Sequence, residues 1–175
     1  NNKNVKLDAM KKITVPLMFL MFCFCAVSYG QSKENIFKIE RNKNANVVQY
    51  DVNIDSFGAV DKANPIDAYW VMLAKDGNRE EISAFEKKAY GYKISGNEDG
   101  TFTLILNAVK GKKIKISALG GSVKAEIDIN AKQAYLSKVY VFAKEGGIIP
   151  KVLYYMLTGY DIQTGNEVSE KIDVK

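Results

Sequence analysis

The chain has 175 residues, of which 47% are hydrophobic, enough for one domain with a packed core. Its formal charge of +5 would suit an anionic partner such as nucleic acid, but residues 31–175 carry 21 basic and 19 acidic side chains, a net charge of only +2. We therefore expect no nucleic-acid partner. One group of lysines clusters, and a solvated hairpin is the expected explanation: Lys110, Lys112, Lys113 and Lys115.

Residues 10–30 have the order of a secretory signal peptide. Two lysines follow Met10, an apolar stretch covers 13–27, and small residues lead to Gly30. This order predicts cleavage between Gly30 and Gln31. An uncleaved membrane anchor is the alternative, but the apolar stretch is short for spanning a bilayer.

The predicted organisation has three parts. Residues 1–9 are expected to be upstream or fragment residues, 10–30 form the signal peptide, and 31–175 form a single β-rich domain. We therefore expect a secreted protein, periplasmic or extracellular, with no stable membrane span after cleavage. Both cysteines, Cys23 and Cys25, belong to the leader, so the exported part must be stabilised by apolar burial rather than by disulfides.

Apolar and polar residues alternate with period two along most of the exported part, which is typical of strands with one face on a core. The segments with the clearest alternation are 48–54, 66–73, 102–106, 114–118, 123–129, 139–142, 152–162 and 168–174. About nine such strands are too many for a single twisted sheet with one solvated face. The predicted fold is therefore all-β, a mainly antiparallel sandwich or barrel.

One segment departs from this alternation and favours a helix. Ser83 and Glu86 have the spacing of a capping box, and Gly91 is placed to end a helix. We expect a short helix over 84–90 that packs over the sheet or plugs one end of it.

Missing residue types exclude several kinds of catalysis. Without histidine, and without cysteine after the leader, the exported part cannot form a Ser-His or Cys-His nucleophile pair, or a zinc or iron site built on imidazole or thiolate. No phosphate loop or dinucleotide fingerprint is present, so we expect no cofactor and assign no catalytic residue or metal ligand. A hydrolase that uses two carboxylates remains the enzyme alternative. The acidic pairs available to it are Glu80 with Glu81, Asp51 with Asp55, and Glu167 with Glu170.

Aromatic residues supply the candidate ligand contacts. Tyr69 and Trp70 stand early in a predicted strand, Tyr90 and Tyr92 flank the end of the predicted helix, and Tyr154 lies in the penultimate strand. Each phenol or indole presents an apolar body and one polar tip, which suits the lining of a ligand pocket. The alternative is that these rings pack in the core or at strand edges without any ligand.

Several short strings carry a resemblance to a known family. They are Ile39-Glu40-Arg41-Asn42, Asn46-Val47-Val48-Gln49-Tyr50, Asn64-Pro65-Ile66 to Tyr69-Trp70, Ala89-Tyr90-Gly91-Tyr92, and Gly159-Tyr160 to Thr164-Gly165. In them the chain resembles the uncharacterised bacterial family named domain of unknown function 4833, common in exported proteins of Bacteroidetes. The resemblance covers nearly all of 35–175 and implies an exported single domain. It supplies no activity and no site residues.

These observations lead to three functional hypotheses. The first is a non-enzymatic envelope protein that binds a small or lipid-like ligand or another envelope protein, and a cavity of sufficient size would favour it. The second is a carboxylate-dependent glycan hydrolase, which needs two acids facing one cleft. The third is a purely structural or docking module, which predicts an exposed apolar patch or an open strand edge.

Overall fold

The computed structural model describes residues 32–174 except 110, 120, 145 and 147–149. The proposed cleavage site at Gly30 and Gln31, the apolar leader and Lys110 lie outside the described residues. No helix in the described ranges is long and apolar enough to cross a membrane.

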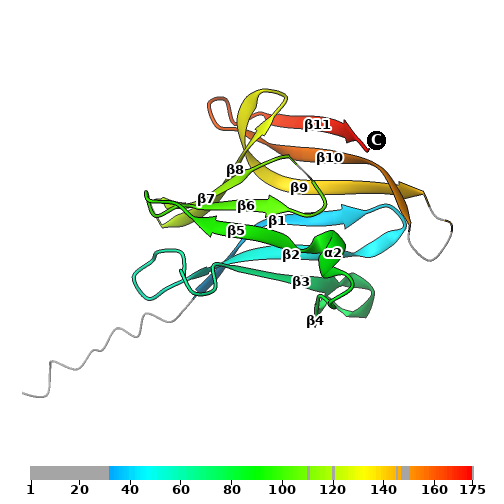
Figure 1. The fold of residues 1–175 in the computed structure, drawn as a ribbon, viewed down its shortest axis with the longest axis horizontal. Coiled ribbons are helices and arrows are strands. Elements are labelled where there is room, and N and C mark those ends of the chain that lie inside the picture. The colour runs from blue at the N-terminus through cyan, green and yellow to red at the C-terminus, as the bar shows by residue number, and fades with distance from the viewer. Residues whose placement is uncertain (1–31, 110, 120, 145, 147–149, 175) are drawn as a thin grey trace, which may run out of the picture.

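Strands dominate the fold (Figure 1). In chain order the elements are β1 (Ser32–Arg41), β2 (Asn44–Ile54), β3 (Ile66–Met72), the 3-10 turn η1 (Leu73–Lys75), β4 (Asn78–Glu81), α2 (Lys87–Tyr90), β5 (Tyr92–Gly96), β6 (Phe102–Leu106), β7 (Ile114–Leu119), β8 (Ser122–Ile129), β9 (Lys132–Lys144), β10 (Lys151–Asp161) and β11 (Glu167–Asp173). The expected all-β class with one short helix is confirmed.

All strands belong to one curled sheet that branches at β9 and forms a half-barrel. Its main order is β4-β3-β2-β1-β9-β8-β7-β6-β5. The first residues of β9 pair with β8, and its later residues pair in parallel with the end of β1. The other edge of β9 pairs antiparallel with β10, which pairs in turn with β11. This branch brings the ends of β1 and β9 and the start of β10 to one end of the molecule (Figure 1).

The alternating apolar faces meet inside the half-barrel. Tyr50 is fully buried there and stacks on Phe37 with ring centroids 4.6 Å apart. Between β6 and β10 the interior is closely filled: the space lined by Leu106, Ile127 and Leu157, among others, is too small to hold a water molecule. Any ligand must therefore bind outside this packed interior.

Helix α2 is shorter than expected, because 83–86 form a capping turn before it. The Ser83 backbone N–H donates to Glu86 Oε2 at 2.9 Å, and the Glu86 backbone N–H donates to Ser83 Oγ at 3.3 Å, as the capping box predicted. Tyr50 Oη donates to the Tyr90 carbonyl, which fixes the end of the helix over β2. Gly91 is needed here, because a Cβ at this position would lie 2.2 Å from the Lys87 carbonyl oxygen.

The lysine cluster is only partly the solvated hairpin that we expected. Lys113 is exposed, and Lys115 pairs with Asp99 at 3.3 Å. Lys112 instead donates to the Asp128 carbonyl at 2.8 Å and to Glu170 Oε2 at 2.7 Å. Its side chain therefore ties the loop before β7 to β8 and β11, a tertiary contact that charge spacing could not show.

Candidate functional site

A cleft of about 550 Å³ opens beside α2 and is lined by residues from the end of β1, the later part of β9 and the first half of β10. Small-molecule sites usually measure about 300–1,000 Å³, so this volume is sufficient for a ligand. Its lining includes Arg41, Trp70, Phe85, Glu86, Tyr90 and Tyr155.

The α2 side of the cleft is built on Trp70. This side chain is only 9% exposed, and its ring meets Tyr90 edge-on with centroids 5.0 Å apart. Trp70 Nε1 donates to Glu86 Oε1 at 3.1 Å, while Glu86 Oε2 accepts from Ser83 Oγ at 2.6 Å. The capping turn of the helix is therefore locked to β3, and this wall is preorganised.

The facing wall comes from β9 and β10. Val141 and Tyr155 are directly opposite each other in the β9–β10 ladder, and both line the cleft. Val152 adds apolar surface, and Phe85, which is 60% exposed, stands at the rim of the α2 side. The cleft is thus mostly apolar, with a small number of polar groups.

Those polar groups include two cations and one carboxylate: Arg41, Lys88 and Glu86. The hydrogen bonds from Ser83 hold the pKa of Glu86 below its usual value, so this side chain is anionic at neutral pH. Burial raises the pKa of the Tyr90 phenol, although the nearby charge of Arg41 opposes that shift. The phenol is therefore neutral at physiological pH.

The family model described as domain of unknown function DUF4833 matches residues 37–171. The chain belongs to this family. The match extends from β1 into β11, so every strand that lines the cleft is part of the DUF4833 domain. No curated protein and no solved structure matches the chain significantly.

Two of the five aromatic residues predicted to bind ligand meet in the cleft of the DUF4833 domain. Trp70 and Tyr90 both line it and contact each other. Tyr92 is half-buried outside the cleft lining, with its ring centroid 6.2 Å from that of Tyr50, and its hydroxyl donates to the Ile66 carbonyl at 2.8 Å and links β5 to β3. Its placement fits a structural role in the half-barrel.

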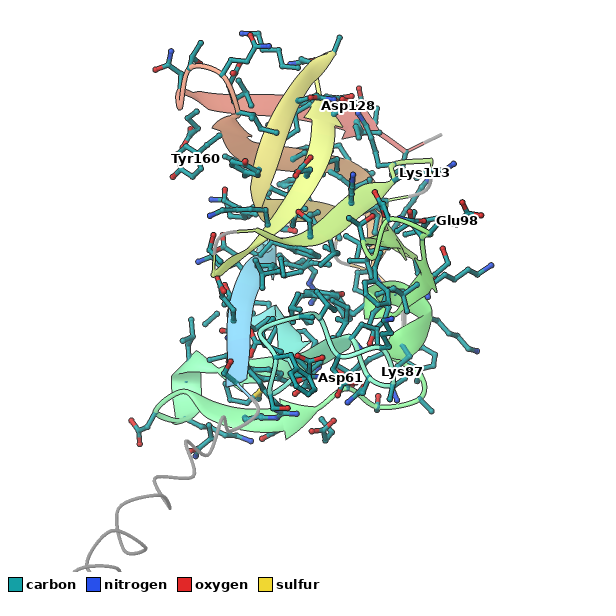
Figure 2. The ribbon with its side chains drawn as sticks, turned by 90° about the vertical axis from the view of Figure 1, so that its left-hand side faces the viewer. Asp61, Lys87, Glu98, Lys113, Asp128 and Tyr160 are labelled. Atoms are coloured by element: carbon teal, nitrogen blue, oxygen red, sulfur yellow. The ribbon has the colours of Figure 1, made fainter. Side chains whose placement is uncertain are left out.

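The other two predicted residues lie away from the cleft. Tyr154 stacks on Phe142 with ring centroids 4.9 Å apart, and Lys171 lies 4.7 Å from its ring centroid. Tyr69 precedes Trp70 in β3 and therefore points to the opposite face of the sheet. In Figure 2, Tyr160 of β10 and Lys87 of α2 lie on opposite sides of the molecule.

Tyr69 belongs to a polar network on the outer face of the sheet. Asp51, only 5% exposed, accepts from Tyr69 Oη at 2.6 Å, Gln49 Nε2 at 2.9 Å and Asn35 Nδ2 at 3.1 Å. Burial and the bond to Asp51 raise the pKa of Tyr69 to about 12. The guanidinium of Arg79 lies 4.0 Å from the centroid of the Tyr69 ring and covers it.

A second carboxylate, Asp67, stands directly opposite Asp51 in the β2–β3 ladder. It accepts two hydrogen bonds of 3.0 Å from Arg79 and one from Lys33. Burial opposes its ionisation, but these cations outweigh burial and hold the pKa of Asp67 below its usual value. Both carboxylates are thus engaged in fixing the register of β1–β4, and neither reaches the cleft.

The acidic pairs considered from sequence do not meet in the cleft either. Glu80 and Glu81 lie on the exposed strand β4, and Glu170 is bound to Lys112. Within the described ranges, no group of three or more acidic, histidine or cysteine side chains could hold a metal ion. Sequence reasoning missed Arg41, Phe85 and Tyr155 as cleft residues, because only tertiary structure brings their three segments together.

Proposed function

We propose that this DUF4833 protein is an exported, non-enzymatic binding protein that holds a small or lipid-like ligand in the cleft beside α2. The observation that carries the proposal is the cleft itself, about 550 Å³ of mostly apolar space next to a closely filled interior. A folded β domain buries apolar surface wherever it can, so an open apolar cleft with a preorganised wall suits a ligand site.

The chemistry of the cleft supports binding over hydrolysis. Glycosidases use two carboxyl groups about 5–10 Å apart around the scissile bond. Among the described residues that line the cleft, Glu86 is the one carboxylate, and both of its oxygens already accept hydrogen bonds. Its interactions suit the anchoring of α2 better than acid–base catalysis.

Export is part of the same proposal and rests on sequence. The leader over 10–30 has the order of a signal peptide, and the rest of the chain lacks cysteine. We expect the full chain to be cut after Gly30 and released into the periplasm or beyond, where the ligand would come from the envelope or the medium. Bacteroidetes-type envelopes are the setting that the family resemblance favours.

Native mass spectrometry of the full chain, expressed in a host that exports it, tests both parts. The intact mass reports whether cleavage occurs before Gln31, and an adduct that is lost on denaturation reports a bound ligand. Ala89 is exposed and lines the cleft, so Ala89→Phe should displace the adduct by filling the space. Ala63→Phe, in the loop before β3, is the matched control and should retain it.

A ligand-free mass from the native host, together with no binding in a screen of small amphiphiles and sugars, would contradict the proposal. An adduct that survives Ala89→Phe as well as Ala63→Phe would show that a ligand binds elsewhere. In that case the cleft would lose its role, although a binding function would stand.

A further inference from the structure

We infer that the ligand of this cleft is an amphipathic anion, with an apolar body against the aromatic walls and its negative group beside Lys88. The inference rests on the proposed binding function and adds the charge and shape of the ligand. Three observations carry it: the charges inside the cleft, the lysines around it, and the position of the apolar surface.

The charges inside the cleft favour an anion. Arg41 and Lys88 approach from different walls, the end of β1 and helix α2. The opposing carboxylate, Glu86, already accepts hydrogen bonds from Ser83 and Trp70 on both of its oxygens. A cationic ligand would therefore have to compete with those donors for Glu86, whereas an anion would meet the ammonium group of Lys88.

Lysines gather around the same end of the molecule. Lys43 is in the turn between β1 and β2, and Lys87 is in α2, next to Lys88. Across the ladder, Lys144 of β9 and Lys151 of β10 are directly opposite each other, a like-charge arrangement that destabilises a strand pair. Among the described residues none of these five lysines has a carboxylate within 4 Å, whereas most of the other described lysines do.

The position of these lysines limits what each can do. Lys144 and Lys151 alternate with Ala143 and Val152, which line the cleft, so they point to the other face of the sheet. They contribute to the positive potential at this end rather than to direct contacts. Lys88 is the direct candidate, because it lines the cleft with its Nζ 5.6 Å from the ring centroid of Phe85.

The apolar surface has the complementary arrangement. Phe85 at the rim, Trp70 on the α2 side and Tyr155 on the β10 side give apolar contact on both walls. A ligand with an acyl or ring body could lie between the walls while its anionic end remains near the rim, where water and Lys88 both reach it. A fully charged ligand such as inorganic phosphate would leave this apolar surface unused.

The chain supplies its own reporter, since Trp70 is its single tryptophan and lies in the cleft wall. The test titrates the exported protein with three probes that share a ten-carbon chain, each below its micellar concentration: decanoate, decyl glucoside and decyltrimethylammonium. The emission of Trp70 and the melting temperature are both followed. We expect decanoate to bind at least about tenfold more tightly than decyltrimethylammonium, and added salt to weaken it.

Charge variants assign the effect to the cleft. Lys88→Gln should weaken decanoate binding about two- to fivefold, as expected for a partly exposed charge pair, and should leave decyl glucoside unchanged. Lys113→Gln removes the same charge from an exposed site away from α2 (Figure 2) and should change neither. A melting temperature equal to that of the unsubstituted protein shows that both variants are folded.

The possible outcomes separate this inference from the proposed function. Equal binding of the three probes, or preference for the cation, would overturn the anionic assignment and leave a small-ligand site. Binding of none of them, with no adduct from the native host, would overturn both. A second assay measures cosedimentation of the protein with phosphatidylglycerol vesicles, with and without decanoate. If the protein cosediments equally in both cases, it docks on a bilayer instead of capturing a free amphiphile, and the inference is refuted.

Discussion

Glu86 joins the capping turn of α2 to β3, so its replacement by alanine removes three hydrogen bonds at once. Two come from Ser83 and one from Trp70 Nε1. Loss of a helix cap costs about 1 kcal/mol. Leaving the largely buried indole N–H of Trp70 without its acceptor costs about 1 kcal/mol more. This is the lower end of the usual cost for an unsatisfied buried donor, because water in the cleft can replace the lost acceptor. We therefore expect Glu86→Ala to lower the free energy of unfolding by about 2 kcal/mol, or about 4–8 °C in Tm.

Urea denaturation followed by the emission of Trp70 measures this loss directly. Glu98→Ala is the matched control, because Glu98 is exposed in the turn before β6, away from α2 (Figure 2), and should unfold at the midpoint of the unsubstituted protein. Glu86→Gln keeps an acceptor oxygen and should lose about half as much. If Glu86→Ala and Glu98→Ala unfold at the same urea concentration, the capping turn does not hold the cleft wall in place.

Two further predictions concern other parts of the domain, and a third concerns the pH dependence of Glu86. Gly159→Ala should lower the free energy of unfolding by more than about 2 kcal/mol, because its Cβ would lie 2.5 Å from the Tyr135 carbonyl oxygen. The control is Gly96→Ala, whose Cβ would have no neighbour nearer than 3.6 Å and which should change the urea midpoint little. Lys112→Ala should lower the free energy of unfolding by about 1–2 kcal/mol, because the loop before β7 loses its bonds to β8 and β11. Amide hydrogen exchange should then be faster in β11. Hydrogen bonds from the capping serine depress the pKa of Glu86, so its contribution to stability is complete above its usual value of 4.5 and is lost as the pH falls through the lower folded value. The urea midpoint should therefore fall less steeply between about pH 5 and pH 3 in Glu86→Gln than in the unsubstituted protein.

Period-two alternation was sufficient to predict most strands, because half-buried strands repeat apolar residues on one face. It did not reveal β4, whose four residues are all exposed and carry no apolar pattern. It also gave no sign of β1, where the fully buried side chains are confined to Phe37 and Ile39. No local pattern could predict the branch at β9, because it depends on which strands pair with the first and the later residues of this 13-residue strand.

The candidate site shows the same division between local and tertiary information. Tyr69 and Trp70 are adjacent in one strand, so alternation alone implies that they face opposite sides of the sheet and cannot line one cleft together. The capping box gave the place of Glu86, because its signal is contained in four residues. Arg41 and Tyr155 carry no such signal, since they reach the cleft through the parallel pairing of β1 with β9 and the pairing of β9 with β10.

The way α2 is anchored explains why a cleft persists beside it. Its three anchors are Glu86 to Trp70, the Tyr90 carbonyl to Tyr50 Oη, and the Lys87 carbonyl to Asn107 Nδ2 at 2.9 Å. These anchors lead to β3, β2 and the segment after β6, so they fix the helix to one wall, while the other wall is built separately by β9 and β10. A ligand that contacts both walls would add a link between them, and binding to the folded state alone stabilises it in proportion to RT ln(1 + [L]/Kd). Ligand-induced stabilisation that is lost when Glu86 is replaced would therefore show that α2 and the binding site act as one unit.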